Sequence, residues 1–150
     1  MQLAHATAIL ANDGVVMKPH LVKMIENGTT HQRTLTVPKE SYRIPLKQEN
    51  IDVIKNATAG VNKEGTGARA FARAEYVSAG KTGTAQVIAI KKGEKYDASK
   101  ISDRHHDHAL YTAFAPADHP RIALALIVEN GGFGGACLLY TSPSPRDQRG

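Results

Sequence analysis

The sequence is poor in the residues that define several classes of protein. It has one cysteine, Cys137, and no tryptophan. A lone cysteine excludes an internal disulfide and gives no indication of the redox compartment. With only three phenylalanines and five tyrosines, an aromatic platform for stacking single-stranded nucleic acid is not expected. No apolar run approaches the roughly 18 residues that a membrane-spanning helix needs. Met1 is followed by a helical pattern and not by a basic, then apolar leader, so we expect neither a signal peptide nor a membrane anchor in this stretch.

The remaining composition is typical of a globular domain. The 150 residues are 41% hydrophobic and 22% charged, which suffices for one domain with a real core. The net charge of +5 is compatible with an anionic substrate. It is too diffuse to indicate nucleic acid by itself, and nothing in the composition indicates a cofactor.

The apolar spacing predicts an α+β domain with an antiparallel sheet covered by helices. The last predicted strand, 122–128, is apolar on both faces, which predicts that helices bury both sides of the sheet. Proline and glycine divide the remainder into segments. The expected order is a helix over 1–13, a β-rich stretch over 15–25, a polar connector or weak strand pair over 29–47, a helix over 48–62, a turn at 65–67, a strand through 78–90, a polar loop over 91–108, and a hairpin over 109–115 and 122–128.

One stretch, 78–87, carries the strongest chemical signal. Lys81 and two threonines surround Gly83, and the stretch runs into Val87, Ile88 and Ile90, which favour a strand. A glycine inside a strand is typical of a place where something approaches the backbone. Lys81 would supply positive charge, and Thr82 and Thr84 would supply hydroxyl donors. We therefore expect an anion-binding site, for a carboxylate or a phosphate, on a strand edge.

Two other interpretations of the polar residues are weaker. Gly80-Lys81-Thr82 resembles part of a nucleotide-binding P-loop, but the first glycine of that motif is replaced by Glu75, and the pattern continues as a strand where a P-loop opens a helix. Asp103, His106 and His108 are of metal-ligand type. Nothing in the sequence supplies the supporting contacts that a metal site needs, so we interpret their segment as a solvated polar loop and expect no metal.

Lys81-Thr82-Gly83 is also the third motif of the penicillin-recognising serine acyltransferases. The chain resembles the C-terminal part of the transpeptidase domain of class B penicillin-binding proteins, and most closely their elongation type, penicillin-binding protein 2. The resemblance covers residues 2–136. It rests on residues 2–8, 10–12, 65–66, 80–87, 96, 107–108, 112–116 and 128–132.

The resemblance implies a serine β-lactamase/D,D-peptidase-like fold and a specific set of roles. Lys81 lines the cleft, while Thr82 and Thr84, with Gly83 between them, bind the terminal carboxylate of a D-alanyl-D-alanine stem peptide or of a β-lactam. The backbone N–H of Thr84 is one of two oxyanion-hole donors. Simple alternation sends Lys81 and Thr82 to opposite faces of the strand, so both reach one ligand only at the edge of the sheet.

The resemblance also implies a setting for the longer parent protein. It cross-links peptidoglycan as a D,D-transpeptidase through an acyl-enzyme and supports cell-wall biogenesis and cell shape. It is anchored in the inner membrane with a periplasmic catalytic domain. Its partners are a SEDS-family glycosyltransferase and the elongation machinery, with no cofactor and no nucleic acid.

Acyl transfer needs a nucleophile and a base, which this chain does not supply. Ser78-x-x-Lys81 has the spacing of the family's first motif, but that motif opens a helix, whereas here it lies on a predicted strand. No Ser-x-Asn occurs in the chain. We therefore expect a fragment that starts after the first two motifs. It should be inactive alone and marginally stable, because faces that pack on the missing part would be exposed. A non-catalytic anion-binding α+β module and, on charge alone, a nucleic-acid module are the alternatives.

The last segment, 137–150, has a different character. It shows no helical period and contains Pro143 and Pro145. Its sequence resembles the translation of a sequencing-library transposase adapter. We expect this tail to be adapter-derived and non-native, which places the end of the domain at residue 136 and Cys137 outside it.

Overall fold

The chain folds as an α+β domain with antiparallel sheets and helices, as predicted. The computed structural model describes residues 1–89, 93, 97 and 101–140. Its helices are α1 (Gln2–Ala11), α2 (Gln48–Lys63), α3 (Ala68–Phe71), the 3₁₀-helix η2 (Asp103–His105) and α4 (Gly134–Tyr140). Its strands are β1 (Val15–Met17), β2 (Met24–Glu26), β3 (Arg33–Leu35), β4 (Glu40–Arg43), β5 (Ala79–Ala85), β6 (His108–Ala115) and β7 (Ile122–Val128).

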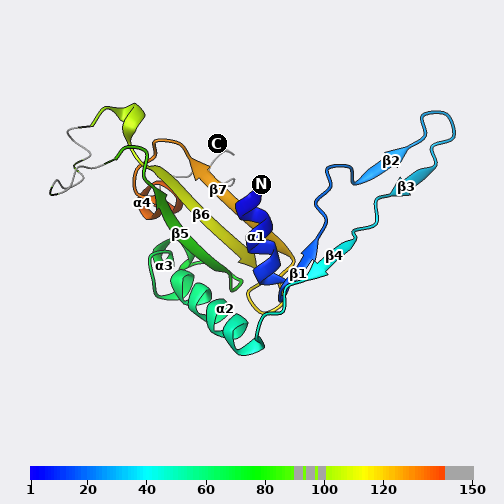
Figure 1. Cartoon of the computed structure of the whole chain (residues 1–150), viewed down its shortest axis with the longest axis horizontal. Helices are drawn as coiled ribbons and strands as arrows, with labels where there is room; N and C mark the ends of the chain where they lie inside the picture. The colour runs from blue at the N-terminus through cyan, green and yellow to red at the C-terminus, as the bar shows by residue number, and fades with distance from the viewer. Residues whose placement is uncertain (90–92, 94–96, 98–100, 141–150) are drawn as a thin grey trace.

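A three-stranded antiparallel sheet forms the centre of the molecule (Figure 1). Its order is β5-β6-β7, so β5 is an edge strand of the described sheet. Lys81 on β5 pairs with Thr112 on β6, which in turn pairs with Ala125 on β7. The predicted hairpin is therefore confirmed, and the stretch with Lys81 lies on an open edge.

Small apolar residues bring helices close to both faces of this sheet. On one face Ala79 and Phe114 pack with Ala11 of α1 and Ala59 of α2. On the other face Phe71, which ends α3, packs against a buried cluster. That cluster consists of Ala109, Tyr111 and Ala113, and Cys137 of α4 also packs against it. Alanines at these positions let the helix backbones approach the sheet, which is how a small domain reaches core packing density.

A long arm extends away from the sheet (Figure 1). The predicted weak strand pair over 29–47 exists as β3 and β4, but these strands do not pair with each other. β4 pairs with β1 at the base of the arm, and β3 pairs with β2 at its tip. Near the tip Arg33 Nε donates to Glu26 Oε2 at 2.6 Å. Most residues of the arm are exposed, since a two-stranded ribbon has no second layer to cover it.

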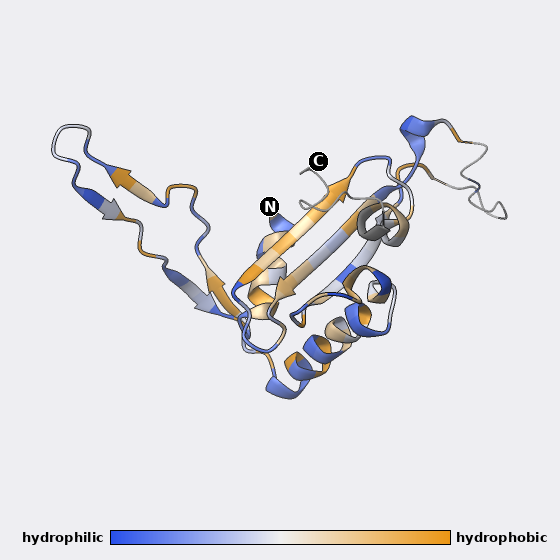
Figure 2. Cartoon of the chain, turned by 180° about the vertical axis from the view of Figure 1, so that it is seen from behind, coloured by the Kyte–Doolittle hydropathy of each residue, from blue (hydrophilic) through white to orange (hydrophobic). Residues whose placement is uncertain are grey.

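The prediction that both faces of 122–128 are buried is wrong for this chain. Ile122 is 66% exposed and Ile127 is 56% exposed. Only the Ala123 side packs into the cluster of α1 and β6. Much of β7 is hydrophobic (Figure 2), yet it is an edge strand with nothing paired beyond it among the described residues. An apolar edge strand without a neighbour leaves its side chains in water.

Two predicted boundaries are also corrected. The strand through Lys81 ends at Ala85 instead of continuing through Val87 and Ile88, because the Val87 N–H donates to Asp107 Oδ1 at 3.2 Å and leaves the ladder; Ile90 lies outside the described residues. At the other end, the segment from 137 does contain helix, since α4 runs to Tyr140. The helix ends before the two prolines, and residues 141–150 lie outside the described part.

Candidate functional site

Lys81 and Thr82 meet at the open edge of β5. Lys81 is exposed, and its Nζ donates to the backbone carbonyl of Thr82 at 2.7 Å. Alternation sends the two side chains to opposite faces, as expected. The Lys81 side chain nevertheless folds over the strand edge and brings its ammonium to the backbone of its neighbour. The Lys81 ammonium therefore lies beside the Thr82 backbone, and the joint binding of one ligand by the two side chains stays a prediction.

Thr82 and Thr84 lie on one face of β5, opposite to Lys81 and Gly83. The Thr82 hydroxyl lies 3.2 Å from the hydroxyl of Thr66, which belongs to the turn between α2 and α3. Thr84 Oγ1 accepts a hydrogen bond of 3.4 Å from the backbone N–H of Gly134, at the start of α4. Two hydroxyls two residues apart on one strand face can both point at one ligand.

The backbone of β5 presents polar groups to the open edge. In a strand, the N–H and C=O of one residue point the same way, and successive residues alternate. The Lys81 side chain reaches the backbone carbonyl of Thr82, so the backbone N–H and C=O of Thr82 point to the open edge. By the same alternation Thr84 also faces the edge. Gly83 faces β6, in keeping with its pairing to Leu110.

A buried polar network holds β5 in place. Asn62 of α2 donates from Nδ2 to Ser78 Oγ at 3.0 Å, and its Oδ1 accepts from Tyr111 Oη at 2.9 Å. Asn62, Ser78 and Tyr111 are 4%, 6% and 4% exposed. Burial, together with the nearby Tyr76, raises the pKa of the Tyr111 phenol, although its bond to Asn62 acts in the opposite direction. The network joins α2, the residue before β5, and β6, so it holds the start of the strand that carries Lys81 against the rest of the domain.

Ser78 is part of this network and not of the exposed edge. Its hydroxyl is buried and accepts the bond from Asn62. Lys81 is exposed and three residues further along the extended chain. The two side chains therefore point apart.

The P-loop alternative is contradicted by the local structure. Lys81 and Thr82 lie inside β5, which continues to Ala85. A phosphate-binding loop needs a helix N-terminus immediately after its lysine, and no helix begins there. The nucleotide-binding interpretation of this stretch is therefore wrong.

The candidate metal ligands do not converge. Asp103 begins the 3₁₀-helix η2, and His108 begins β6. His108 Nδ1 accepts from the Asn130 N–H at 2.8 Å, and the Asn130 side chain donates to the carbonyl of His106 at 2.9 Å. Within 1–89, 93, 97 and 101–140 no three acidic, histidine or cysteine side chains group as metal ligands. These contacts attach the end of the polar loop to the turn after β7.

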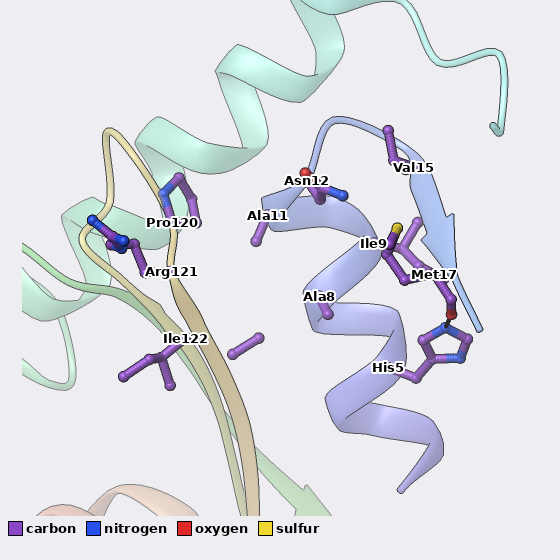
Figure 3. Close-up of a pocket in the computed structure, with 11 residues that line it drawn as sticks. His5, Ala8, Ile9, Ala11, Asn12, Val15, Met17, Pro120, Arg121 and Ile122 are labelled. Atoms are coloured by element: carbon purple, nitrogen blue, oxygen red, sulfur yellow. Dashed lines mark hydrogen bonds between the residues drawn. The ribbon is translucent and has the colours of Figure 1, made fainter. Parts of the chain in front are cut away.

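A separate cavity of about 210 Å³ lies between α1, β1 and the start of β7 (Figure 3). Its walls are mostly apolar, with Ile9 and Met17 on one side and Ile122 on the other. The ring of His5 points at the carbonyl oxygen of Met17, with Nε2 at 3.0 Å, so this group is already engaged (Figure 3). None of the β5 residues lines the cavity. The cavity lies beside the exposed start of β7 and is distinct from the β5 edge that carries Lys81.

Comparison with known proteins assigns the chain and its fold to a family. A family model described as the penicillin binding protein transpeptidase domain matches residues 1–141. The chain belongs to this family. Within it, the chain is of the penicillin-binding protein 2, or MrdA, type, which is a D,D-transpeptidase family.

The individual relatives agree. The peptidoglycan D,D-transpeptidase MrdA of Haemophilus influenzae is 40% identical over 144 residues, which cover 89% of this chain and 21% of the relative. The structure of Pseudomonas aeruginosa PBP2 with WCK 5153 is 36% identical with a TM-score of 0.67, covering 91% of this chain and 26% of that one. Penicillin-binding protein A of Mycobacterium tuberculosis, solved as a penicillin G acyl-enzyme, is 29% identical with a TM-score of 0.60, covering 91% and 28%. The chain thus spans about a fifth of the length of the MrdA relative.

The sequence did not point to two residues that build the edge. Asn62 was assigned only to a helix. Thr66 was assigned to a turn and to one of the stretches that carry the family resemblance, but to no role at the site. A buried asparagine at a helix end and a threonine between two glycines are weak signals, because both residue types are common at such places. Among the described residues, no helix has the length and apolar character needed to cross a membrane.

Proposed function

We propose that this chain is one wall of the active site of a peptidoglycan D,D-transpeptidase. The observation that carries the proposal is Lys81-Thr82-Gly83-Thr84 on the open edge of β5, in a chain of the penicillin-binding transpeptidase family. The ligand of this edge is the D-alanyl-D-alanine end of a stem peptide or a β-lactam, which imitates it. Both carry a carboxylate beside the acyl group that reacts.

The carboxylate is bound by Thr82 and Thr84, with Lys81 nearby. The two hydroxyls lie on one strand face, and the ammonium lies at the same edge, 2.7 Å from the Thr82 carbonyl. Hydrogen bonds to a charged group contribute about 1.5–3 kcal/mol each. Selectivity for a carboxylate terminus over an uncharged one follows from this arrangement.

The backbone N–H of Thr84 acts on the reacting carbonyl. Alternation turns it toward the open edge, where it donates to the oxyanion that forms when a serine attacks the acyl carbon. Because the strand holds this donor in place before the reaction, no reorganisation is needed. Loss of one such donor typically costs ~3 kcal/mol of transition-state stabilisation.

The nucleophile is supplied from outside this chain. Ser78 is buried and bonded to Asn62, and the chain contains no Ser-x-Asn. We therefore propose that the described segment is inactive alone and works as part of a longer protein. The exposed apolar side chains of β7 support this, because in the longer protein they have a surface to pack on.

The setting of the longer protein rests on its family. We propose an inner-membrane anchor, a periplasmic catalytic domain, and pairing with a SEDS-family glycosyltransferase in the elongation machinery. We also retain the proposal that 137–150 is an adapter-derived tail, although α4 includes its first four residues. An independently prepared genomic library tests the tail, since an adapter-derived sequence will be replaced by another continuation of the gene.

The decisive experiment uses a fluorescent penicillin. The gene upstream of Met1 is expected to encode, in frame, a Ser-x-x-Lys followed by a Ser-x-Asn. The full-length product should form a covalent penicillin adduct, and residues 1–140 alone should form none. In the full-length protein, Lys81→Ala should slow labelling about 10–100-fold, the loss of one charge-assisted hydrogen bond. Lys23→Ala, an exposed lysine on the arm, is the matched control and should label normally.

Four results would contradict the proposal. An upstream gene sequence without the two motifs, or a full-length protein that does not react, would remove the transpeptidase function. A labelled serine in the chain alone would show that the nucleophile lies inside it. Reversible carboxylate binding without any adduct in the full-length protein would favour the non-catalytic anion-binding module.

A further inference from the structure

Thr66 connects the proposed carboxylate-binding site on β5 to a different part of the domain. It lies in the turn between α2 and α3, and its Oγ1 is 3.2 Å from Thr82 Oγ1 across sixteen positions of sequence. We propose that Thr66 is a positioning residue of this site: its hydroxyl donates to Thr82 and thereby directs the Thr82 proton at the substrate carboxylate. The inference rests on the proposed function, because it names a further residue of the same carboxylate-binding site.

The direction of this hydrogen bond follows from the ligand. Each hydroxyl has one proton and two acceptor lone pairs. If Thr82 donated to Thr66, no Thr82 proton would remain for the ligand. A carboxylate only accepts, so its binding selects the opposite arrangement, in which Thr66 donates to Thr82 and Thr82 donates to the carboxylate. The two hydroxyls then form a short chain in which each bond polarises the next.

The turn that carries Thr66 is held tightly on the end of α2. The Gly65 N–H donates to the Gly60 carbonyl at 3.0 Å, and the Gly67 N–H donates to the Val61 carbonyl at 2.9 Å. Neither glycine has room for a side chain. A Cβ at Gly65 would lie 2.8 Å from Val61 Cα, and one at Gly67 would lie 2.7 Å from the side-chain oxygen of Asn62. Thr66 is therefore flanked by two glycines that pack closely on the end of α2.

The end of α2 is in turn fixed to the sheet. Asn62, whose side-chain oxygen would meet a Cβ at Gly67, is the centre of the buried network with Ser78 and Tyr111. Ser78 precedes β5, the strand that carries Thr82. Thr66 and Thr82 are thus held from two sides of one buried hydrogen-bond network. A hydroxyl held in this way keeps its partner oriented without a further entropy cost at binding, which is the property of a preorganised site.

The test compares three single variants of the full-length protein. Thr66→Val removes the hydroxyl and keeps the branched shape. We expect its rate of acylation by benzylpenicillin to fall about fivefold, the effect of one hydrogen bond of ~1 kcal/mol. Thr66→Ser, which retains the hydroxyl, should restore most of the rate. Thr58→Val is the matched control, because the Thr58 hydroxyl bonds within α2, to the Ile54 and Lys55 carbonyls at 2.8 and 3.0 Å. It should acylate at the wild-type rate.

Two further measurements separate positioning from a general structural effect. In a double-mutant cycle, Thr66→Val should have almost no additional effect in a Thr82→Val background, because it acts through that hydroxyl. It should also leave unchanged the slow acylation by a penicillin methyl ester, which lacks the carboxylate. Equal slowing with acid and ester, additive effects in the cycle, or no rescue by serine would each overturn the role of Thr66. A wild-type full-length protein that is not acylated would instead overturn the proposed function itself.

Discussion

The Asn62 network predicts a large loss of stability from one small change. Asn62→Ala removes the donor to Ser78 Oγ and the acceptor for Tyr111 Oη, both at buried positions. Each buried polar group left without a partner costs about 1–3 kcal/mol. Two such groups cost about 2–6 kcal/mol, and because the serine hydroxyl can rotate toward another acceptor, we expect a total in the lower half of this range, about 3 kcal/mol. This is a large fraction of the stability of any domain of this size.

Urea unfolding followed by far-UV circular dichroism measures this loss, since the chain has no tryptophan to serve as a fluorescence probe. With a slope of about 2 kcal/mol per molar urea, the midpoint should fall by roughly 1.5 M. Asn56→Ala, an exposed asparagine of the same helix, is the matched control. It should be neutral or stabilise by less than about 0.7 kcal/mol, because alanine is the better helix former. An osmolyte added equally to all variants keeps the transition measurable if the parent chain is marginal. If the midpoints of the two variants agree within about 0.3 M, the network does not carry the energy assigned to it.

Two further predictions follow from close contacts and from burial. Gly134→Ala places a Cβ against the Gly83 carbonyl oxygen, so it should lower the melting temperature strongly and disturb the Thr84 contact. Gly135→Ala, whose Cβ meets no described atom within 4 Å, should be neutral or stabilising, and equal melting temperatures of the two variants would contradict the close approach of α4 to β5. The raised pKa of Tyr111 means that folding favours its neutral form, so its contribution to stability is complete below pH 10 and is lost as the pH rises above the pKa of the unfolded chain. Unfolding free energies measured between about pH 9 and 11.5 should fall more steeply for the wild type than for Tyr111→Phe, and parallel curves would argue against a buried phenol.

Several features could be predicted from the sequence because they depend on local patterns. The helix of Gln48–Lys63 and the hairpin of β6 and β7 follow from the spacing of their apolar residues and from the turn between the strands. The anion-binding site could be proposed because its residues, Lys81-Thr82-Gly83-Thr84, are adjacent in sequence, so no tertiary contact is needed to bring them together. Family membership rests on the same stretches and was confirmed by comparison.

Other features depend on contacts between distant segments. The strand ends at Ala85 because Asp107, twenty positions away, takes the Val87 N–H. The exposure of β7 depends on whether another strand or helix lies beside it. The apolar sequence of 122–128 does not show whether such a neighbour is present. The helical start of the last segment depends on packing of α4 against the sheet, which compensates for its weak helical pattern.

The sequence by itself thus determined the chemistry of the edge: one ammonium, two hydroxyls and a glycine on one strand, with no nucleophile to match. Only the tertiary structure decided how that edge is held. It buried Ser78 with Asn62 and Tyr111, and it placed Thr66 beside Thr82. The physical reason is that residue types along one strand are a local property, whereas the hydrogen bonds that orient them join positions 16 and 49 residues apart.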